Sequence, residues 1–232
     1  MRPIVPRIIT TFGTGQAAEA LRISLPFMQA YAARHDAMLI VPSDTEVEWC
    51  CEGRPPSWGK IEWLRRLSIH FPGSQVLWLD ADVIVCRHDV SIFGKDEPHR
   101  LHERPWVSMV VQNTIDGAVP SCGVMLLNNQ ADWAVNAYDL VWSGAGADGM
   151  NSDRRSNGWW EQVAMIRFLG GDPDQHPIVS PPPSGRWGQL DYGWNPHPCD
   201  ERGVPEDCRF FHATAVDDRL GAMREWAAKV QL

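Results

Sequence analysis

Two aspartates that directly follow an apolar run are the residues of this sequence best suited to chemistry. The run covers residues 76–79, and Asp80 and Asp82 come next, separated by one alanine. Such a continuous apolar run is typical of a strand buried on both faces of a sheet. Two carboxylates this close repel one another unless one is protonated or a cation lies between them. A hard divalent cation that also binds phosphate oxygens resolves the repulsion, so the pair predicts a site for Mn2+ or Mg2+.

The segments before the aspartates alternate between strand and helix patterns. Strands are predicted at residues 4–12, 38–41 and 76–79, and helices at 17–34 and 60–69. Strands that alternate with helices form parallel sheets, and open α/β sheets bind ligands at the carboxyl ends of their strands. Both aspartates are therefore expected at a ligand-binding edge. A solvated surface turn is the alternative, and a second apolar run at 83–85 argues against it.

The rest of the chain contains further elements and two regions without them. Strands are predicted at 106–112, 124–127 and 209–212, helices at 131–142, 159–169 and 218–230, and loops from 42 to Ser57 and at 145–157. Residues 172–207 are rich in proline, glycine and tryptophan, which favours the wall of a pocket over a core element.

Composition limits the classes of protein that remain. The chain has 232 residues, of which 44% are hydrophobic and 22% charged, so we expect a globular domain. Its net charge of −8 disfavours general binding to nucleic acid. No apolar run reaches the roughly 18 residues of a membrane span, and no signal-peptide core is seen at the start. Six cysteines without a C-x-x-C pair fit a reduced, cytoplasmic protein.

Three motifs in order give the sequence a resemblance to a known family. They are the stretch from Trp58 through Lys60 to Ile61, the pair Phe71-Pro72, and the tryptophan-containing strand that ends in Asp80-Ala81-Asp82. In these motifs the chain resembles glycosyltransferases of the GT-A fold. More narrowly, it resembles galactomannan galactosyltransferases, xyloglucan xylosyltransferases and related mannosyltransferases.

The wider retaining group that includes glycogenin-like enzymes adds further matches. These are a Gly-Val-x-Leu-x-Asn strand at residues 123–128, the dipeptide Glu161-Gln162, and His212 after Phe211. In that group the late histidine is followed by a glycine and then a lysine, and this chain has neither within that short stretch. Arg219 is a candidate to replace the lysine.

The resemblance implies a fold, a domain organisation and residue roles. It implies one α/β domain over residues 1–232 with a Rossmann-like mixed, mostly parallel sheet flanked by helices, its nucleotide-binding half at about 1–105 and its acceptor-side half at about 106–232. The activity would be metal-dependent transfer of a sugar from a nucleotide-diphosphate sugar, UDP-linked by family likeness, with retention. The implied metal ligands are Asp80, Asp82 and His212, and the implied donor-site residues are Thr10, Thr11, Phe12, Lys60, Arg65, Asp80, Ala81 and Arg219. Glu161 and Gln162 would lie at the sugar and the reacting carbon.

Tryptophan is unusually common, with 12 residues. Indole rings offer flat apolar area to the C–H faces of sugars together with an N–H donor. Trp159, Trp160, Trp187 and Trp194 all fall in the second half of the chain. We expect Trp187 and Trp194 to contact a ligand, because their glycine-rich loops should be exposed. The acceptor itself, whether glycan, small molecule, protein or modified base, stays open.

Each carried-over role has a structural alternative. Lys60 could lie on a helix surface, His212 could be a packed core histidine, and Glu161 could favour the dipole of its helix. In an inverting enzyme, Glu161 or Asp191 would be the base.

Three other functions compete with the transferase. A phosphatase of the haloacid dehalogenase type also uses an apolar strand with Asp-x-Asp, but it favours Thr or Val where Ile84 stands. A sugar nucleotidyltransferase would need a longer glycine-rich loop near the start than residues 13–15. A non-catalytic zinc or sugar-binding module is the third, with a possible zinc set formed by His197, Cys199, Cys208 and His212. A Cys199–Cys208 disulfide is a further alternative for these cysteines.

Overall fold

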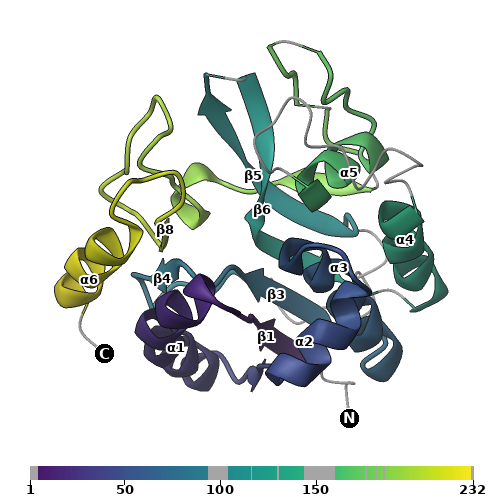
Figure 1. The fold of residues 1–232 in the computed structure, drawn as a ribbon, viewed down its shortest axis with the longest axis horizontal. Coiled ribbons are helices and arrows are strands. Elements are labelled where there is room, and N and C mark those ends of the chain that lie inside the picture. Colours follow the sequence, from purple (N-terminus) through teal and green to yellow (C-terminus); the bar gives the residue numbers. More distant parts are fainter. Residues whose placement is uncertain are drawn as a thin grey trace.

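A six-stranded mixed sheet forms the centre of the molecule (Figure 1). The computed structural model describes residues 5–93, 104–115, 117–129, 131–143, 160–175, 177–180, 182–184 and 186–230. The loop predicted at 145–157, and Trp159, lie outside these residues. Within the described residues no helix is long and apolar enough to cross a membrane.

The sheet has the strand order β2-β1-β3-β6-β5-β7. The strands are β1 (Arg7–Thr10), β2 (Met38–Ile40), β3 (Gln75–Leu79), β5 (Val107–Thr114), β6 (Gly117–Asn128) and β7 (Trp187–Gln189). β1 pairs in parallel with β2 and β3, as the alternating pattern predicts, and β5 pairs in parallel with β7. β6 runs antiparallel to both β3 and β5. The predicted mixed, mostly parallel sheet is confirmed.

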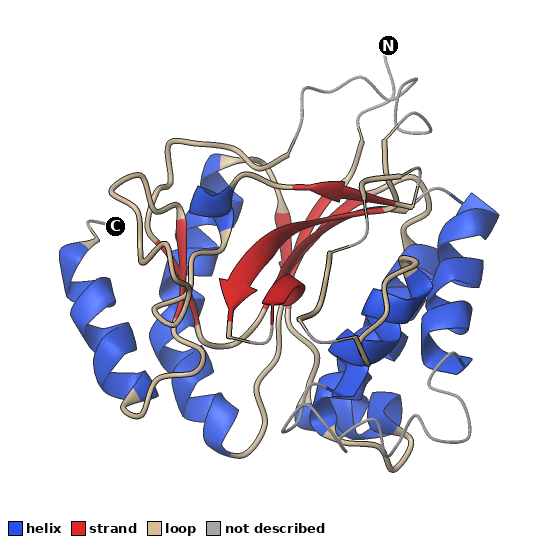
Figure 2. Ribbon diagram, turned by 90° about the horizontal axis from the view of Figure 1, so that it is seen from above, coloured by secondary structure: helices blue, strands red, loops and turns tan. Residues whose placement is uncertain are grey.

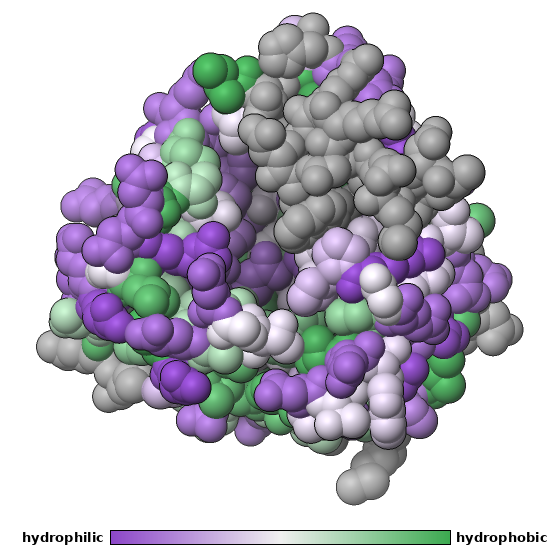
Figure 3. All heavy atoms as spheres, in the orientation of Figure 1, coloured by the Kyte–Doolittle hydropathy of each residue, from purple (hydrophilic) through white to green (hydrophobic). Residues whose placement is uncertain are grey.

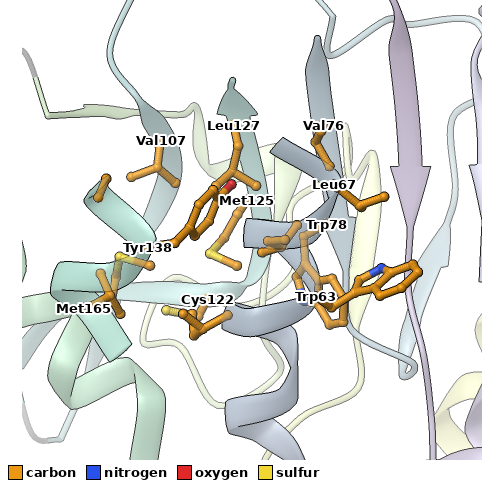
Figure 4. Packing of buried hydrophobic residues seen from close by; sticks show 14 of the residues in the cluster. Trp63, Leu67, Val76, Trp78, Val107, Cys122, Met125, Leu127, Tyr138 and Met165 are labelled. Atoms are coloured by element: carbon orange, nitrogen blue, oxygen red, sulfur yellow. The ribbon is translucent and has the colours of Figure 1, made fainter. Parts of the chain in front are cut away.

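Helices cover both faces of this sheet (Figure 2). They are α1 (Gln16–Arg34), α2 (Asp44–Cys51), α3 (Pro56–His70), α4 (Ala131–Ser143), α5 (Trp160–Phe168) and α6 (Arg219–Lys229). One hydrophobic cluster joins α2, α3, α4 and α5 to the sheet, and Figure 4 shows Trp63 and Leu67 of α3 packing beside Trp78 of β3. A second cluster joins α1 and α6 to the opposite face. Each face thus buries its own apolar side chains, as a sheet that is apolar on both faces requires.

A second, two-stranded sheet lies between α1 and α6, formed by β4 (Val83–Val85) and β8 (Phe210–His212). The two strands are antiparallel, with Val83 opposite His212. All residues of both strands are buried. The sequence indicates the apolar run of β4 but not its partner, because pairing between residues so distant in the chain leaves no local pattern.

Two predictions about local structure were wrong. The segment predicted as a loop up to Ser57 contains α2, and α3 begins at Pro56 rather than at residue 60. α2 begins with a capping box, in which Ser43 Oγ accepts from Glu46 N and Glu46 Oε2 accepts from Ser43 N. This motif satisfies backbone donors that a helix end leaves unpaired, and it was the overlooked signal.

β6 also begins earlier than predicted, at Gly117 rather than at residue 124. Its first half, which includes Pro120, has the sequence Gly-Ala-Val-Pro-Ser-Cys-Gly and carries little strand propensity. Pairing with β5, interrupted by a register shift between Met109 and Val110, keeps this half in the sheet.

The capping box gives a first testable prediction. Replacing Ser43 by alanine removes the side-chain acceptor for Glu46 N, so the free energy of unfolding should fall by about 1 kcal/mol. Ser43→Thr retains a hydroxyl and should lose much less. Urea unfolding of both variants measures the difference, and equal losses would contradict a capping role.

Candidate functional site

The side chains of Asp80, Asp82 and His212 converge at the carboxyl end of β3. The two aspartates lie in the turn between β3 and β4, which is closed by a hydrogen bond from Val83 N to Asp80 O of 3.1 Å. His212 ends β8, and its Nε2 lies 3.2 Å from Asp82 Oδ1 and 3.9 Å from Asp80 Oδ2. One ligand atom from each residue lies within 4.8 Å of the others.

This donor set fits a divalent metal ion. Two carboxylates and an imidazole match the ligand preferences of Mn2+, and carboxylate oxygens also suit Mg2+. Among the residues that the structure describes, no other group of three or more histidine, cysteine, aspartate or glutamate side chains has metal-binding spacing. Burial acts to raise the pKa of Asp82, but His212 and Arg219 hold it below its usual value, so this carboxylate is ionised.

Two hydrogen-bond donors orient the carboxylate of Asp80 by binding the same oxygen. Its Oδ1 accepts hydrogen bonds from Trp78 Nε1 at 2.7 Å and from Lys60 Nζ at 3.0 Å. The other oxygen, Oδ2, is the one nearer His212. The hydrogen bonds to Oδ1 thus fix the rotamer of Asp80, and Oδ2 is left to bind a metal ion.

Lys60 bridges the two sides of the site. Its ammonium lies 3.0 Å from Asp80 Oδ1 and 2.8 Å from Glu161 Oε1, and its side chain is 6% exposed. Burial alone would lower the pKa of Lys60, but the carboxylates of Asp80 and Glu161 raise it above its usual value. The buried lysine is therefore charged, and the alternative of a helix-surface lysine is wrong.

Gly123 of β6 makes room for the imidazole of His212. A Cβ atom at this position would collide with the imidazole ring of His212. Its carbonyl accepts from Asp80 N at 2.8 Å, which ties β6 to the turn that holds the aspartates. Beside it, Cys122 N donates to Gln162 Oε1 at 3.3 Å. The predicted Gly-Val strand and the predicted Glu161-Gln162 pair thus meet at one place.

A cavity of about 760 Å³ opens beside these residues. Figure 3 shows this face of the molecule, with hydrophilic side chains at a hollow near its centre. Of the predicted site residues, those that line the cavity are Phe12, Lys60, Asp80, Ala81, Asp82, Glu161, Gln162, His212 and Arg219. Arg219 begins α6, and its Nε lies 3.4 Å from Asp82 Oδ2. Elements far apart in the chain therefore bring most of the predicted residues together.

Three predicted donor-site residues lie elsewhere. Thr10 is fully buried, where it donates to Ile40 O at 2.6 Å and accepts from Trp63 Nε1 at 2.8 Å. Thr11 is also fully buried and is not part of the cavity lining. Arg65 pairs with Glu62 across one turn of α3, at 2.6 Å, and is likewise outside the lining.

The exposure predicted for Trp187 and Trp194 was wrong. Trp187 is 1% exposed and Trp194 is 8% exposed, and neither belongs to the cavity lining. Trp187 pairs its Nε1 with Pro182 O, and Trp194 packs edge-on against Phe210. Their glycine neighbours do not expose these rings. Trp187 lies in β7 and packs in the first hydrophobic cluster, and Trp194 packs against Phe210 of β8.

The cysteines do not support the zinc alternative. Cys199 is exposed and free, and Cys208 lies beside Cys86, with the two Sγ atoms 3.9 Å apart. Neither cysteine belongs to a metal-binding group of three among the described residues. Cys199 and Cys208 are both free, so the predicted alternative of a disulfide between them is also not formed.

Sequence reasoning missed the buried polar residues around His212, of which Ser121 and Gln112 also line the cavity. Asn195, Ser121 and Gln112 are all at most 3% exposed. His212 Nδ1 lies 3.1 Å from Asn195 Oδ1, and Asn195 Nδ2 donates to Ser121 Oγ at 3.0 Å. Asn195 falls in the segment for which no element was predicted, and no local pattern distinguishes it there.

Solved structures with a similar arrangement of elements are glycosyltransferases. A glycosyltransferase involved in the glycosylation of the major capsid of PBCV-1 matches with a TM-score of 0.60 and 16% identity, over 96% of this chain and 99% of its own. The chain has a glycosyltransferase fold. GlyE of Streptococcus pneumoniae TIGR4 matches with a TM-score of 0.53 and 13% identity, over 95% of this chain and 60% of the GlyE chain. No family model matches the sequence, and no curated protein does.

The buried lysine gives a second testable prediction. Lys60→Met leaves the carboxylates of Asp80 and Glu161 without their shared cation, so the free energy of unfolding should fall by about 3–5 kcal/mol. The double variant Lys60→Met/Glu161→Gln should lose less than the sum of the two single variants, because it removes one of the stranded charges. Urea unfolding provides all the values.

Lys229→Met is the matched control for this experiment. Lys229 forms an exposed pair with Glu225, and losing such a pair costs about 1 kcal/mol or less. Equal destabilisation by Lys60→Met and Lys229→Met would contradict the bridging role of Lys60.

Proposed function

We propose that the protein is a metal-dependent glycosyltransferase that moves a sugar from a nucleotide-diphosphate sugar to an acceptor hydroxyl. The observation that carries this proposal is the convergence of Asp80, Asp82 and His212 beside a cavity, in a chain with a glycosyltransferase fold. The fold by itself supports a transferase. The donor set adds the metal dependence, because acidic side chains alone would repel a diphosphate.

The donor would bind with its diphosphate at the metal site. Asp80, Asp82 and His212 would hold Mn2+ or Mg2+, which when bound neutralises the negative charge that develops on the leaving diphosphate. Arg219, 47% exposed in the cavity, offers a guanidinium that exchanges Asp82 for a phosphate oxygen. It would take the place of the lysine that glycogenin-like enzymes carry after their histidine.

The nucleotide base would lie at the wall of the cavity that Phe12 forms. Phe12 lines the cavity and packs edge-on against Trp78, with ring centroids 5.1 Å apart. Its ring offers a flat apolar face to the base, and a UDP-sugar is the donor that the family likeness favours. Thr10 and Thr11 are fully buried outside the cavity lining, so neither would contact the base directly.

The sugar would lie between the metal site and α5. Glu161 and Gln162 line the cavity on this side, and Lys60 holds the Glu161 carboxylate at 2.8 Å. A carboxylate near the reacting carbon stabilises the positive charge that develops there as the leaving group departs. The departing phosphate can accept the acceptor's proton, so retention needs no strong base. Asp191, the other base considered for inversion, is exposed, pairs with Arg209 at 2.7 Å and lies outside the cavity lining.

Metal dependence gives the third testable prediction. Asp82→Ala should lower the rate of UDP release from a UDP-sugar by at least roughly a hundredfold, because the diphosphate then meets an incomplete metal site. Asp89→Ala removes a surface carboxylate paired with Arg87 and serves as the matched control. A panel of UDP-sugars with Mn2+ identifies the donor, first by thermal shift and then by UDP release. Full activity in excess chelator would overturn the proposed role of the metal.

The role of Glu161 gives the fourth prediction. Glu161→Gln retains the shape of the side chain but removes the charge, so transfer should fall by at least about tenfold while UDP binding changes little. The reason is that the carboxylate matters most when positive charge develops at the reacting carbon. Turnover and the UDP dissociation constant, measured by calorimetry, separate the two effects. Parallel losses in both would instead assign Glu161 a structural role.

A further inference from the structure

The buried side chain of Asn195 lies directly behind the candidate metal ligand His212. Asn195 is 0% exposed, and its Oδ1 lies 3.1 Å from His212 Nδ1. Its Nδ2 donates to Ser121 Oγ at 3.0 Å, and that oxygen lies 3.3 Å from His197 Nε2. Four buried side chains from β6, β8 and the segment after the short helix η3 (Tyr192–Trp194) thus form one hydrogen-bonded chain at the wall of the cavity.

The direction of each hydrogen bond in this chain follows from the groups available. The hydroxyl of Ser121 has one proton, which it can donate to the ring nitrogen of His197. When His197 Nε2 accepts the hydroxyl proton of Ser121, the oxygen of Ser121 is left to accept from Asn195 Nδ2. The amide oxygen of Asn195 then faces His212 and accepts from an Nδ1–H. With the proton at Nδ1, Nε2 is the ring nitrogen that faces Asp80 and Asp82 and that would be offered to a metal ion there.

We propose that Asn195 is a positioning residue that holds His212 in the Nδ1–H tautomer and in the ring orientation needed for metal binding. The proposal rests on the proposed metal-dependent function and adds a residue to it. Ligating histidines commonly donate their other ring N–H to a fixed acceptor, which sets the tautomer and raises the basicity of the ligand.

The backbone around Asn195 makes this amide a rigid acceptor. Its N donates to Tyr192 O at 3.1 Å, and its carbonyl accepts from Gln112 Nε2. His212 N donates to Pro196 O at 3.3 Å, which ties β8 to the same segment. The backbone of Gly123 in β6 lies against the same ring, where a Cβ atom would collide with it. The imidazole is therefore packed against β6 and held by Asn195.

Mn2+ titration of the free protein tests the consequence for metal binding. Asn195→Ala should weaken Mn2+ binding by about 10- to 100-fold, as is usual when the partner of a ligating histidine is lost. Asn195→Asp retains an oxygen that accepts from Nδ1–H and should recover most of that loss. Electron paramagnetic resonance of unbound Mn2+ gives the dissociation constants without an assay of activity. An unchanged dissociation constant in folded Asn195→Ala protein would overturn the proposal.

Tyr192→Phe is the control for general loosening of the segment. Tyr192 Oη donates to Gly203 O at 2.8 Å and lies 3.5 Å from His197 O, so its hydrogen bonds go to backbone carbonyls of this segment and not to the His212 ring. This variant should lose stability while it keeps its affinity for Mn2+. A loss of Mn2+ affinity equal to that of Asn195→Ala would show that any weakening of the segment suffices, and would overturn the proposal.

The tautomer itself can be measured in the wild-type protein with diamagnetic Mg2+ in place of Mn2+. Nitrogen-15 NMR of labelled histidine should then show His212 with its proton at Nδ1 and none at Nε2. A proton that stays on Nε2 in the metal-loaded protein would overturn the proposal. Failure of the wild-type protein to bind any divalent ion would overturn the metal-dependent function itself, whereas metal binding that Asn195→Ala leaves unchanged would overturn only the role of Asn195, so the two failures are distinguishable.

Discussion

The antiparallel pairing of β4 with β8 is the constraint on which the candidate site depends. It places His212 opposite Val83, which is the residue that follows Asp82. The next residue after the histidine, Ala213, donates its N–H to Asp82 O at 3.0 Å. Without this pairing the aspartates would form only a charged turn at the end of a buried strand. Both strands are fully buried between α1 and α6, so hydrophobic packing holds the histidine in place before any metal ion binds.

Charge balance is the second requirement of the site. Asp80, Asp82 and Glu161 lie close together, and the structure offsets their charges with Lys60 and Arg219. Lys60 is buried and bridges two carboxylates, so it is part of the scaffold. Arg219 is half-exposed and contacts Asp82 at a longer distance of 3.4 Å, so it is the cation that would exchange Asp82 for the diphosphate of the proposed donor. The two cations therefore have different tasks that their residue types alone do not reveal.

The elements with strong local signals were predicted well, and the exceptions have physical reasons. The apolar β3 and the helical periodicity of α1 and α3 identified the parallel part of the sheet. The first half of β6 was missed because its place in the sheet comes from pairing with β5 and not from its own residues. Trp187 and Trp194 were placed on the surface from their glycine neighbours, whereas packing against distant residues buries both rings.

The sequence by itself indicated the type of chemistry that we propose. Two aspartates at the end of a buried strand predict a divalent metal, and the ordered motifs around them resemble a glycosyltransferase. Only the tertiary structure decided which cation meets which carboxylate, and that Asn195 stands behind His212. The reason is that these contacts join residues from α3, the turn after β3, α5, β8 and α6, which are far apart in the chain. Local sequence encodes the elements, while the packing of their apolar faces sets the distances between the side chains they carry.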